Sequence, residues 1–474
     1  MKRKLILSTL LSIIVGWYAC EQKNTVKESS ERDFSAARDR FTNNCSGCHG
    51  AQMQAFTDRR WKHGNEPDSL YQTIKFGRED LGMPSFKDAF TEEELLDLVA
   101  YIRTGIEKTG QYNFYEQVVS DTFPTTADFQ LKLDTVYSGG SIPWGMAFLP
   151  DGSMLVSEKA GQLYQIGPEG DKLKIEGVPE TREFGQGGLM DIELHPDFEN
   201  NQTLFLTYSK LKVEGEDTLA TTAVSSFTFA NGTLTDPKEL LVALPFSKKP
   251  YHFGSRLEFD PKGYLFLSVG DRGSRDVNPQ SLKSFCGKIH RINSDGSIPE
   301  NNPFVEVDSA IASIYSYGHR NPQGLAFNSS DGHLWEHEHG PRGGDELNII
   351  GKGFNYGWPE VSFGINYDGT IFTSDTVGEG FEEPIHYWVP SIAPCGMDFI
   401  DSDVYPGWEN HLLVASLRFR YLNLCKIEGT KVVSEEHLLP NIGRIRNVKM
   451  GPDGYIYVAV ENPGYIFRLL PISR

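Results

Sequence analysis

Two cysteines and a histidine stand within five residues near the N-terminus, as Cys45-Ser46-Gly47-Cys48-His49. In a C-x-x-C-H sequence two thiols on one turn can reach the two vinyl groups of a haem, and the adjacent imidazole can bind the iron. A zinc half-site and a redox-active CxxC pair are the alternatives, but no second Cys/His pair lies nearby in the sequence to complete a zinc site. The motif therefore predicts a covalent c-type haem attached through Cys45 and Cys48, with His49 on the iron.

A second axial iron ligand is expected downstream of this motif. A methionine thioether in that position raises the reduction potential of the haem, and Met83 stands between Gly82 and Pro84, which favour an extended loop. The following stretch, 91–102, has a Thr/Glu capping box and helical spacing of apolar residues. Residues 34–106 resemble a small class I cytochrome c, so we expect an all-α domain with Met83 as second ligand of the haem iron.

One pattern recurs along the rest of the chain: an apolar pair, then Pro/Asp/Gly turn residues, then a β-branched or aromatic strand. Its six copies begin at Met146, Ile192, Leu257, Leu325, Met397 and Val448. Glycine in such turns supplies a positive φ angle, and repeats at this spacing are typical of propeller blades that carry inserted loops. The repeats predict an all-β six-bladed β-propeller over 131–474, with its functional groups in loops at one mouth of the central channel.

Four stretches in the loops between these repeats carry a family resemblance. They are Gly185-Gln-Gly-Gly-Leu-Met-Asp-Ile-Glu-Leu-His-Pro, His252-Phe-Gly-Ser-Arg with Val269-Gly-Asp, Tyr317-Gly-His-Arg-Asn-Pro-Gln-Gly, and His337-Glu-His-Gly-Pro-Arg-Gly-Gly-Asp-Glu-Leu-Asn, supported by 353–359 and 443–447. Residues 131–470 resemble the soluble PQQ-dependent glucose and aldose sugar dehydrogenases, the glucose/sorbosone dehydrogenase family. The resemblance implies oxidation of an aldose sugar, or a related alcohol, with PQQ and Ca²⁺ as cofactors.

The resemblance assigns catalytic roles to two residues. A histidine at the position of His252 takes the proton of the substrate hydroxyl while hydride passes to the quinone, and a neutral imidazole suits this role near physiological pH. Asp271 would orient and polarise that imidazole. Taken without the resemblance, His252 could equally cap a strand and Asp271 close a turn.

The same resemblance implies a binding pocket for PQQ, whose three carboxylates need cations and amide donors. The candidate contacts are Gln186, Arg320, Asn321, His339, Arg418, Arg444 and Arg446. Arg444 and Arg446 alternate on an expected strand, which places both side chains on one face. His339 stands where the glucose enzymes have a glutamine.

Calcium is implied as the Lewis acid at the quinone, bound by backbone oxygens of Gly340 and Pro341, with Asp345 supporting the loop. Glu346 and Tyr356 match positions that bind a second, structural Ca²⁺ in the glucose enzyme. Without the flanking resemblance, the segment that includes Asp345 would be interpreted as an ordinary β-turn.

The N-terminus predicts export. Residues 1–20 have a basic start, an apolar run and a final Ala-Cys pair, so we expect a signal segment with Cys20 lipidated as a membrane anchor on the periplasmic side. A plain signal peptide and an uncleaved anchor are alternatives. Residues 21–33 are expected to be a tether and 107–130 a linker. Three cysteines remain, Cys286, Cys395 and Cys425, so at least one should be free.

Composition narrows the function further. A formal net charge of −19 argues against a nucleic-acid partner. The family resemblance and the haem motif together imply a dehydrogenase that oxidises a sugar or alcohol and passes electrons to its own haem, then to an acceptor of the respiratory chain. A calcium-dependent propeller lactonase or esterase, and a non-catalytic binding propeller with an electron-transfer haem, are the alternatives; the haem motif counts against the first, and His252 with Gln186 and Arg320 against the second.

Overall fold

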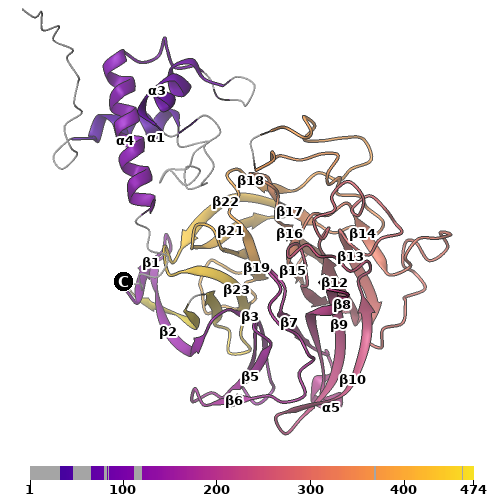
Figure 1. The fold of residues 1–474 in the computed structure, drawn as a ribbon. Coiled ribbons are helices and arrows are strands. Elements are labelled where there is room, and N and C mark those ends of the chain that lie inside the picture. Colours follow the sequence, from indigo (N-terminus) through magenta and orange to yellow (C-terminus); the bar gives the residue numbers. More distant parts are fainter. Residues whose placement is uncertain are drawn as a thin grey trace, which may run out of the picture.

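The computed structural model describes residues 33–45, 64, 66–78, 83, 85–110, 120–367, 370–461 and 463–473, which form a small helical unit and a larger all-β unit (Figure 1). The expected signal segment, Cys20, Cys48 and His49 lie outside these residues. None of the helices in the described ranges is both long enough and apolar enough to span a membrane.

The helical unit comprises α1 (Ser35–Asn44), α3 (Pro67–Phe76) and α4 (Glu92–Gly110). Pro67 opens α3 at the first helical position, where its missing N–H is not needed. Thr91 caps α4: the backbone N–H of Glu94 donates to Thr91 Oγ1 at 3.3 Å, and the N–H of Thr91 donates to Glu94 Oε2 at 2.8 Å. This is the capping box expected from the sequence. The three helices bury a common apolar core that includes Phe41 and Leu98.

The larger unit is a six-bladed β-propeller, as predicted; within the described residues six antiparallel sheets are arranged around one axis (Figure 1). The first two blades consist of β3 (Pro143–Phe148), β4 (Met154–Glu158), β5 (Gln162–Ile166) and β6 (Lys172–Lys174), then β7 (Leu189–Leu194), β8 (Thr203–Glu214), β9 (Asp217–Ala230) and β10 (Thr233–Val242), with the short helix α5 (Phe198–Asn201). The third and fourth consist of β11 (Leu257–Phe259), β12 (Tyr264–Val269), β13 (Lys288–Asn293) and β14 (Ile314–Tyr317), then β15 (Pro322–Asn328), β16 (His333–Glu338), β17 (Asp345–Ile349) and β18 (His386–Trp388). The fifth consists of β19 (Pro394–Phe399), β20 (Leu412–Ser416), β21 (Leu422–Glu428) and β22 (Lys431–Leu438).

The sixth blade joins the two ends of the propeller chain. It contains β23 (Arg444–Met450), β24 (Ile456–Glu461) and β25 (Gly464–Ser473), and β25 pairs with β2 (Phe129–Gly140), which pairs with β1 (Thr122–Pro124). Residues 122–130, expected to be linker, therefore already contain strand. The pairing of an N-terminal strand with the C-terminal strand closes the ring, which removes two exposed sheet edges.

The six sequence repeats all coincide with the first strands of blades. Each copy begins within strand one of its blade (β3, β7, β11, β15, β19 or β23) and continues into the turn that follows it. These six strands contact one another in a closed cycle around the channel. Because the strands run in the same order in every blade, the loops that enter strand one lie at one mouth of the channel, where they can build a shared site.

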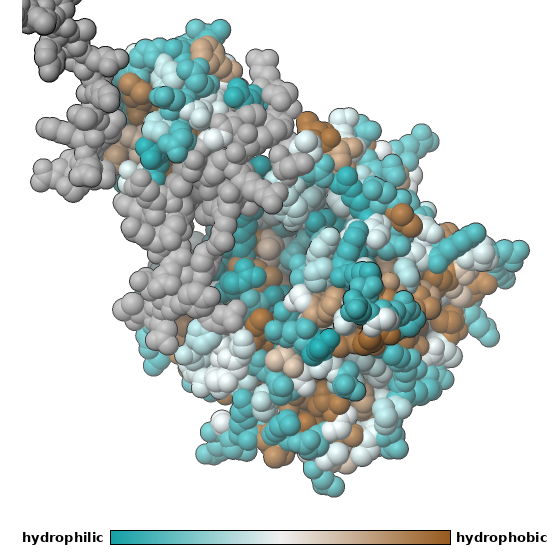
Figure 2. All heavy atoms as spheres, in the orientation of Figure 1, coloured by the Kyte–Doolittle hydropathy of each residue, from teal (hydrophilic) through white to brown (hydrophobic). Residues whose placement is uncertain are grey.

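Apolar side chains fill the spaces between blades. Trp335 of β16 packs edge-on against Phe399 of β19, with ring centroids 5.4 Å apart, in a core shared by blades four and five. The propeller face seen in Figure 2 is mostly hydrophilic, with small hydrophobic groups between. Cys286, Cys395 and Cys425 are all buried and free, so the expectation that at least one remains unpaired is met.

Candidate active site

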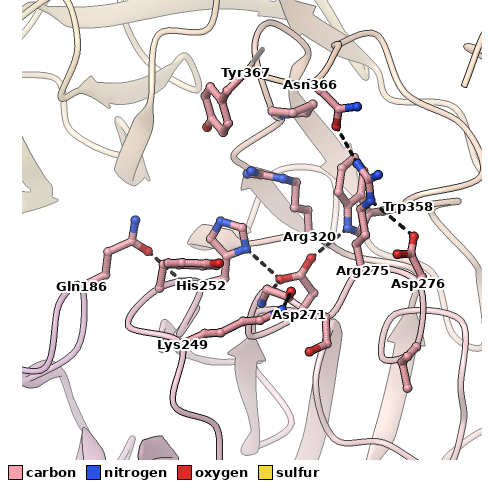
Figure 3. A pocket seen from close by; sticks show the side chains of 15 residues that line it. Gln186, Lys249, His252, Asp271, Arg275, Asp276, Arg320, Trp358, Asn366 and Tyr367 are labelled. Atoms are coloured by element: carbon pink, nitrogen blue, oxygen red, sulfur yellow. Dashed lines mark hydrogen bonds and ion pairs between the residues drawn. The ribbon is translucent and has the colours of Figure 1, made fainter. Parts of the chain in front are cut away.

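A cavity of about 690 Å³ opens among loops of blades two, three and four (Figure 3). Its lining includes Gln186, Lys249, Tyr251, His252, Asp271, Arg275, Asp276, Val277, Arg320, Pro341, Trp358, Asn366 and Tyr367. Five residues predicted from the sequence, Gln186, His252, Asp271, Arg320 and Pro341, thus share one cavity. The volume falls within the range of roughly 300–1,000 Å³ that is usual for small-molecule and cofactor sites.

His252 and Asp271 form a hydrogen-bonded pair in the wall of this cavity. His252 lies in the loop before β11 and Asp271 directly after β12, so the β11–β12 hairpin brings them together; the distance from His252 Nδ1 to Asp271 Oδ1 is 2.7 Å. The indole N–H of Trp358 donates to Asp271 Oδ2 at 3.0 Å, and the backbone N–H of Gly273 donates to Oδ1 at 2.6 Å. Because the carboxylate accepts the Nδ1 proton, the lone pair of the imidazole is on Nε2.

The backbone of His252 adopts an unusual conformation. Its φ angle is +59°, a left-handed region that a residue with a side chain rarely adopts. The N–H of His252 donates to Gln186 Oε1 at 2.8 Å, and the N–H of Gln186 donates to Pro250 O at 2.7 Å. A Cβ atom on Gly270 would approach the carbonyl oxygen of His252 to 2.4 Å, so the residue that immediately precedes Asp271 in the sequence must be glycine.

Burial and charge favour a neutral imidazole. Burial lowers the pKa of His252, and the nearby Arg320 guanidinium lowers it further, which together outweigh the contact with Asp271. Burial also raises the pKa of Asp271, but its hydrogen bond with His252, the charge of Arg320 and the Trp358 donor together hold that pKa below its usual value. The pair is therefore a neutral imidazole beside a carboxylate, which is the arrangement of a general base and its orienting group.

Arg320 and Asn321 are held by blade four. Arg320 Nη1 donates to the carbonyl of His339 at 2.9 Å, and its guanidinium carbon lies 5.3 Å from the Trp358 ring centroid. Asn321 Oδ1 accepts the N–H of Gly254 at 3.2 Å, two residues after His252. Arg320 lines the cavity, whereas the buried Asn321 side chain supports the His252 loop instead.

The remaining predicted arginines are not in the cavity lining. Arg444 Nε lies 2.8 Å from Glu461 Oε2 and Arg446 Nε lies 2.6 Å from Glu461 Oε1, which confirms that both side chains share one face. Arg446 Nη1 also lies 3.2 Å from Cys395 Sγ. Arg418 Nη1 lies 3.5 Å from the carbonyl of Ser391.

His339 lies between Arg320 and the residues that contact Arg446 in a chain of contacts. Its Nε2 donates to the carbonyl of Pro394 at 2.7 Å, next to Cys395, while its own carbonyl accepts from Arg320. Burial lowers the pKa of His339 well below its usual value, so the ring is neutral. Through these two contacts His339 links the Arg320 side chain to the segment that precedes Cys395, whose sulfur lies 3.2 Å from Arg446 Nη1.

Asp345 and Ser391 make hydrogen bonds to the loop that was expected to bind calcium. Asp345 accepts the N–H of Gly340 through Oδ1 and the N–H of Ala393 through Oδ2, both at 2.8 Å, and the Ser391 hydroxyl donates to Pro341 O at 3.3 Å. A Cβ on Gly340 would come within 2.0 Å of Gly344 O, so the turn requires glycine. Pro341 lines the cavity. Backbone carbonyls fixed at a cavity wall fit the hard oxygen donors that Ca²⁺ prefers.

The second expected calcium site falls on an acidic, buried face of β16 and β17. Burial and the charge of Glu338 raise the pKa of Glu346 well above its usual range. Among the described residues, Glu336 Oε1 and Asn348 Oδ1 on the same face are buried without a hydrogen-bond partner. This oxygen-rich set fits a cation. The hydroxyl of Tyr356 is already engaged, since it donates to Ile349 O at 2.5 Å, so only its backbone oxygen suits a metal.

The helical unit brings one predicted haem-attachment cysteine and one predicted iron ligand into one cluster. Cys45 is buried at the end of α1, and Met83, like Phe86 and Phe90, packs against the same apolar core. The backbones of Met83 and Arg78 exchange two hydrogen bonds, which fixes the Met83 turn. A buried thiol and a thioether that contact one apolar core are groups that fit the attachment and iron ligation of a haem.

Sequence reasoning missed several lining residues. Trp358 lies inside the stretch 353–359 that supported the resemblance, so its position in that stretch could have identified it as a residue of the site. Lys249, Arg275 and Tyr367 come from loops with no recognisable motif. Arg275 Nη1 donates to Asn366 Oδ1 at 2.7 Å, a contact between blades three and four that only the fold reveals (Figure 3).

Comparison with known proteins agrees with this architecture. A family model described as "Glucose / Sorbosone dehydrogenase" matches residues 141–468, and one described as "Cytochrome C oxidase, cbb3-type, subunit III" matches residues 32–102. The chain is 41% identical over 339 residues to aldose sugar dehydrogenase YliI of Escherichia coli, covering 69% of this chain and 90% of the relative.

Two solved structures are similar to the propeller. The apo-form of the soluble aldose sugar dehydrogenase from Escherichia coli superposes with a TM-score of 0.69 at 37% identity. The match covers 73% of this chain and 100% of the Escherichia coli chain. The PQQ-bound form of aldose sugar dehydrogenase from Streptomyces coelicolor gives a TM-score of 0.61 at 27% identity, over 74% and 100% of the two chains. The chain therefore belongs to the glucose/sorbosone dehydrogenase family, and carries a cytochrome c domain in front of its dehydrogenase propeller.

Proposed function

We propose that this oxidoreductase oxidises an aldose sugar, or a related alcohol, with PQQ and Ca²⁺, and delivers the electrons to its own c-type haem. The observation that carries the proposal is the His252–Asp271 pair in the wall of a 690 Å³ cavity that Arg320 also lines. The similarity to an aldose sugar dehydrogenase of Escherichia coli supports the substrate class, and the PQQ bound in the Streptomyces structure supports the cofactor.

The chain's own residues supply acid–base chemistry and binding. His252 Nε2 is available to accept the proton of a substrate hydroxyl, and Asp271 stabilises the imidazolium that results. Bound PQQ would accept the hydride from the carbon that carries this hydroxyl, so the sugar loses two electrons and two protons in total. Arg320 and Gln186 in the cavity would hold the quinone, with His339, Arg418, Arg444 and Arg446 at its far carboxylates.

Calcium would be held by the carbonyl oxygens of Gly340 and Pro341, and would polarise a quinone carbonyl when bound. Asp345 accepts the N–H of Gly340 and so fixes the start of this loop, and the Ser391 hydroxyl donates to the carbonyl of Pro341. Glu346, with the backbone of Tyr356, is proposed for the second, structural calcium.

The haem of the fused domain would accept the electrons that substrate oxidation leaves on the quinone. Haem iron accepts one electron at a time, so two transfers must follow each oxidation. A covalent tether raises the concentration of the acceptor near the donor without a stable interface between the domains. A downstream acceptor of the respiratory chain would then reoxidise the haem.

We also propose that the protein is exported and anchored on the periplasmic side by a lipid on Cys20. The basic and apolar residues 1–19 and the Ala19-Cys20 pair support this proposal. Mass spectrometry of the mature N-terminus would test it: a lipidated Cys20 supports the anchor, and an N-terminus at another residue overturns it.

The enzyme activity is tested by anaerobic dye reduction with a panel of aldoses and simple alcohols, with PQQ and Ca²⁺ added singly and together. The proposal expects turnover only when substrate, PQQ and Ca²⁺ are all present, and none for His252→Asn. Lactone hydrolysis by the same protein, without dye reduction, would instead support the hydrolase alternative.

A further inference from the structure

Arg272 is a fully buried arginine whose described acceptors are all backbone carbonyls. Its residue surface is 1% exposed, and its guanidinium donates to the carbonyls of Tyr251, Ala220 and Lys249, the last two at 3.2 and 2.9 Å. Burial lowers the pKa of Arg272 to about 10, so the group is still charged at pH 7. A buried charge without an ion pair is expensive, and here the three carbonyl dipoles, the face of the Phe253 ring and the charge of Asp271 offset part of the cost.

These contacts lie on both sides of His252. The carbonyl of Tyr251 immediately precedes His252, and the ring of Phe253 immediately follows it, with its centroid 3.5 Å from the guanidinium carbon of Arg272. Arg272 is also the neighbour of Asp271 in the chain. One rigid side chain therefore joins the segment that carries the imidazole to the segment that carries its carboxylate partner.

The backbone at both segments needs such a restraint. His252 has φ = +59° and Arg272 itself has φ = +53°, and each costs free energy for a residue with a side chain. A planar guanidinium with several fixed donors can hold three carbonyls in one geometry, whereas a flexible ammonium cannot. The contact with Ala220 further ties this arrangement to β9 of the neighbouring blade.

We infer that Arg272 is a positioning residue for the catalytic pair, which holds His252 in the strained conformation that aims Nδ1 at Asp271. This inference rests on the proposed role of His252 as the base. Arg272 does not line the cavity itself, so it acts through the two segments rather than on a substrate.

The test compares Arg272→Met and Arg272→Lys with a matched control, Arg291→Met. Arg291 is also a buried arginine, stacked over Tyr264 and Tyr315, with hydrogen bonds to Asn301 and Asn302, but it belongs to β13 and has no contact with the catalytic segments. Loss of a buried, hydrogen-bonded guanidinium should lower the unfolding temperature in both positions.

The first readout needs no cofactor. Nitrogen-15 NMR of histidine-labelled full-length protein, with the His252 signals identified from their loss in His252→Asn, reports which imidazole nitrogen carries the proton. We expect a single Nδ1–H tautomer of His252 in the wild type and a mixture of both tautomers in Arg272→Met. In Arg272→Lys the Nδ1–H tautomer should be retained in part. Arg291→Met should resemble the wild type.

The second readout is steady-state dye reduction by the protein loaded with PQQ and Ca²⁺. Misplacement of a catalytic group by about 1 Å can cost about 100-fold, so we expect Arg272→Met to lower kcat about 10- to 100-fold with a smaller change in KM, and Arg272→Lys to recover part of the loss. An unchanged tautomer and kcat in Arg272→Met, with destabilisation equal to that of Arg291→Met, would overturn the inference. Failure of the proposed activity would appear separately, as a wild type with a single tautomer and no turnover.

Discussion

The imidazole of His252 and the carboxylate of Asp271 lie 2.7 Å apart, although 19 residues separate them in the sequence. Asp271 is almost completely buried, and its second oxygen is bound by Trp358. If the carboxylate fixes the tautomer, Asp271→Asn should lower kcat by about 100-fold or more, in line with the 10²–10⁴-fold contribution of general acid–base catalysis. Steady-state kinetics with saturating PQQ and Ca²⁺ would measure this; a change below threefold would show that the pair is not catalytic.

Trp358→Phe isolates the indole donor from the rest of the pair. A hydrogen bond to a charged group contributes about 1.5–3 kcal/mol, so its loss should reduce kcat about tenfold or more if the carboxylate charge matters to the reaction. Trp335→Phe is the matched control, because Trp335 Nε1 donates to Asp331 Oδ2 at 3.1 Å in blade four. Equal effects of the two substitutions on kcat would contradict a specific role for Trp358.

The pH profile follows from the environment of His252. Burial and the Arg320 charge lower its pKa from the usual 6.5, so the imidazole stays neutral and basic at lower pH than an exposed histidine. The value of kcat/KM should therefore rise with pH, reach half of its maximum below pH 6.5 and then level off. A midpoint above that value, measured with a substrate that does not titrate, would contradict the neutral base.

Much of this architecture is visible in local patterns. The C-x-x-C-H sequence, the Thr91/Glu94 capping box and the six turn motifs each depend on residues close together in the chain, so periodicity and turn chemistry were sufficient to predict both domains. The pairing of β1 was missed, because three residues in a polar stretch carry no strand signal.

The contacts between blades could not be predicted in this way. Arg272 donates a hydrogen bond to Ala220, and Arg275 to Asn366, only because blades two, three and four converge at one mouth of the propeller channel. Glu461 stands between the residues that local patterns predict and those that only the fold reveals. The β23–β24 pairing places it opposite Arg444, so a register argument could have identified it as the partner of both arginines.

The calcium loop should be sensitive to Asp345. In Asp345→Asn one carboxylate oxygen is replaced by an NH₂ group, which cannot accept the N–H of Gly340 or Ala393, and an unsatisfied buried donor costs about 1–3 kcal/mol. We expect at least a tenfold rise in the free Ca²⁺ needed for half-maximal dye reduction, measured in EGTA-buffered solutions. Asp375→Asn, in an exposed loop, is the control. An unchanged calcium requirement in Asp345→Asn would show that this loop does not bind the ion.

The most direct measurement is stopped-flow absorbance of the haem after the full-length protein, loaded with PQQ and Ca²⁺, is mixed with an aldose without external acceptor. If the propeller oxidises the sugar and the tethered domain takes the electrons, the haem should be reduced with a first-order rate that does not depend on protein concentration, and His252→Asn should abolish the reduction. A haem that stays oxidised in the loaded wild type, or a reduction rate proportional to protein concentration, would contradict the account.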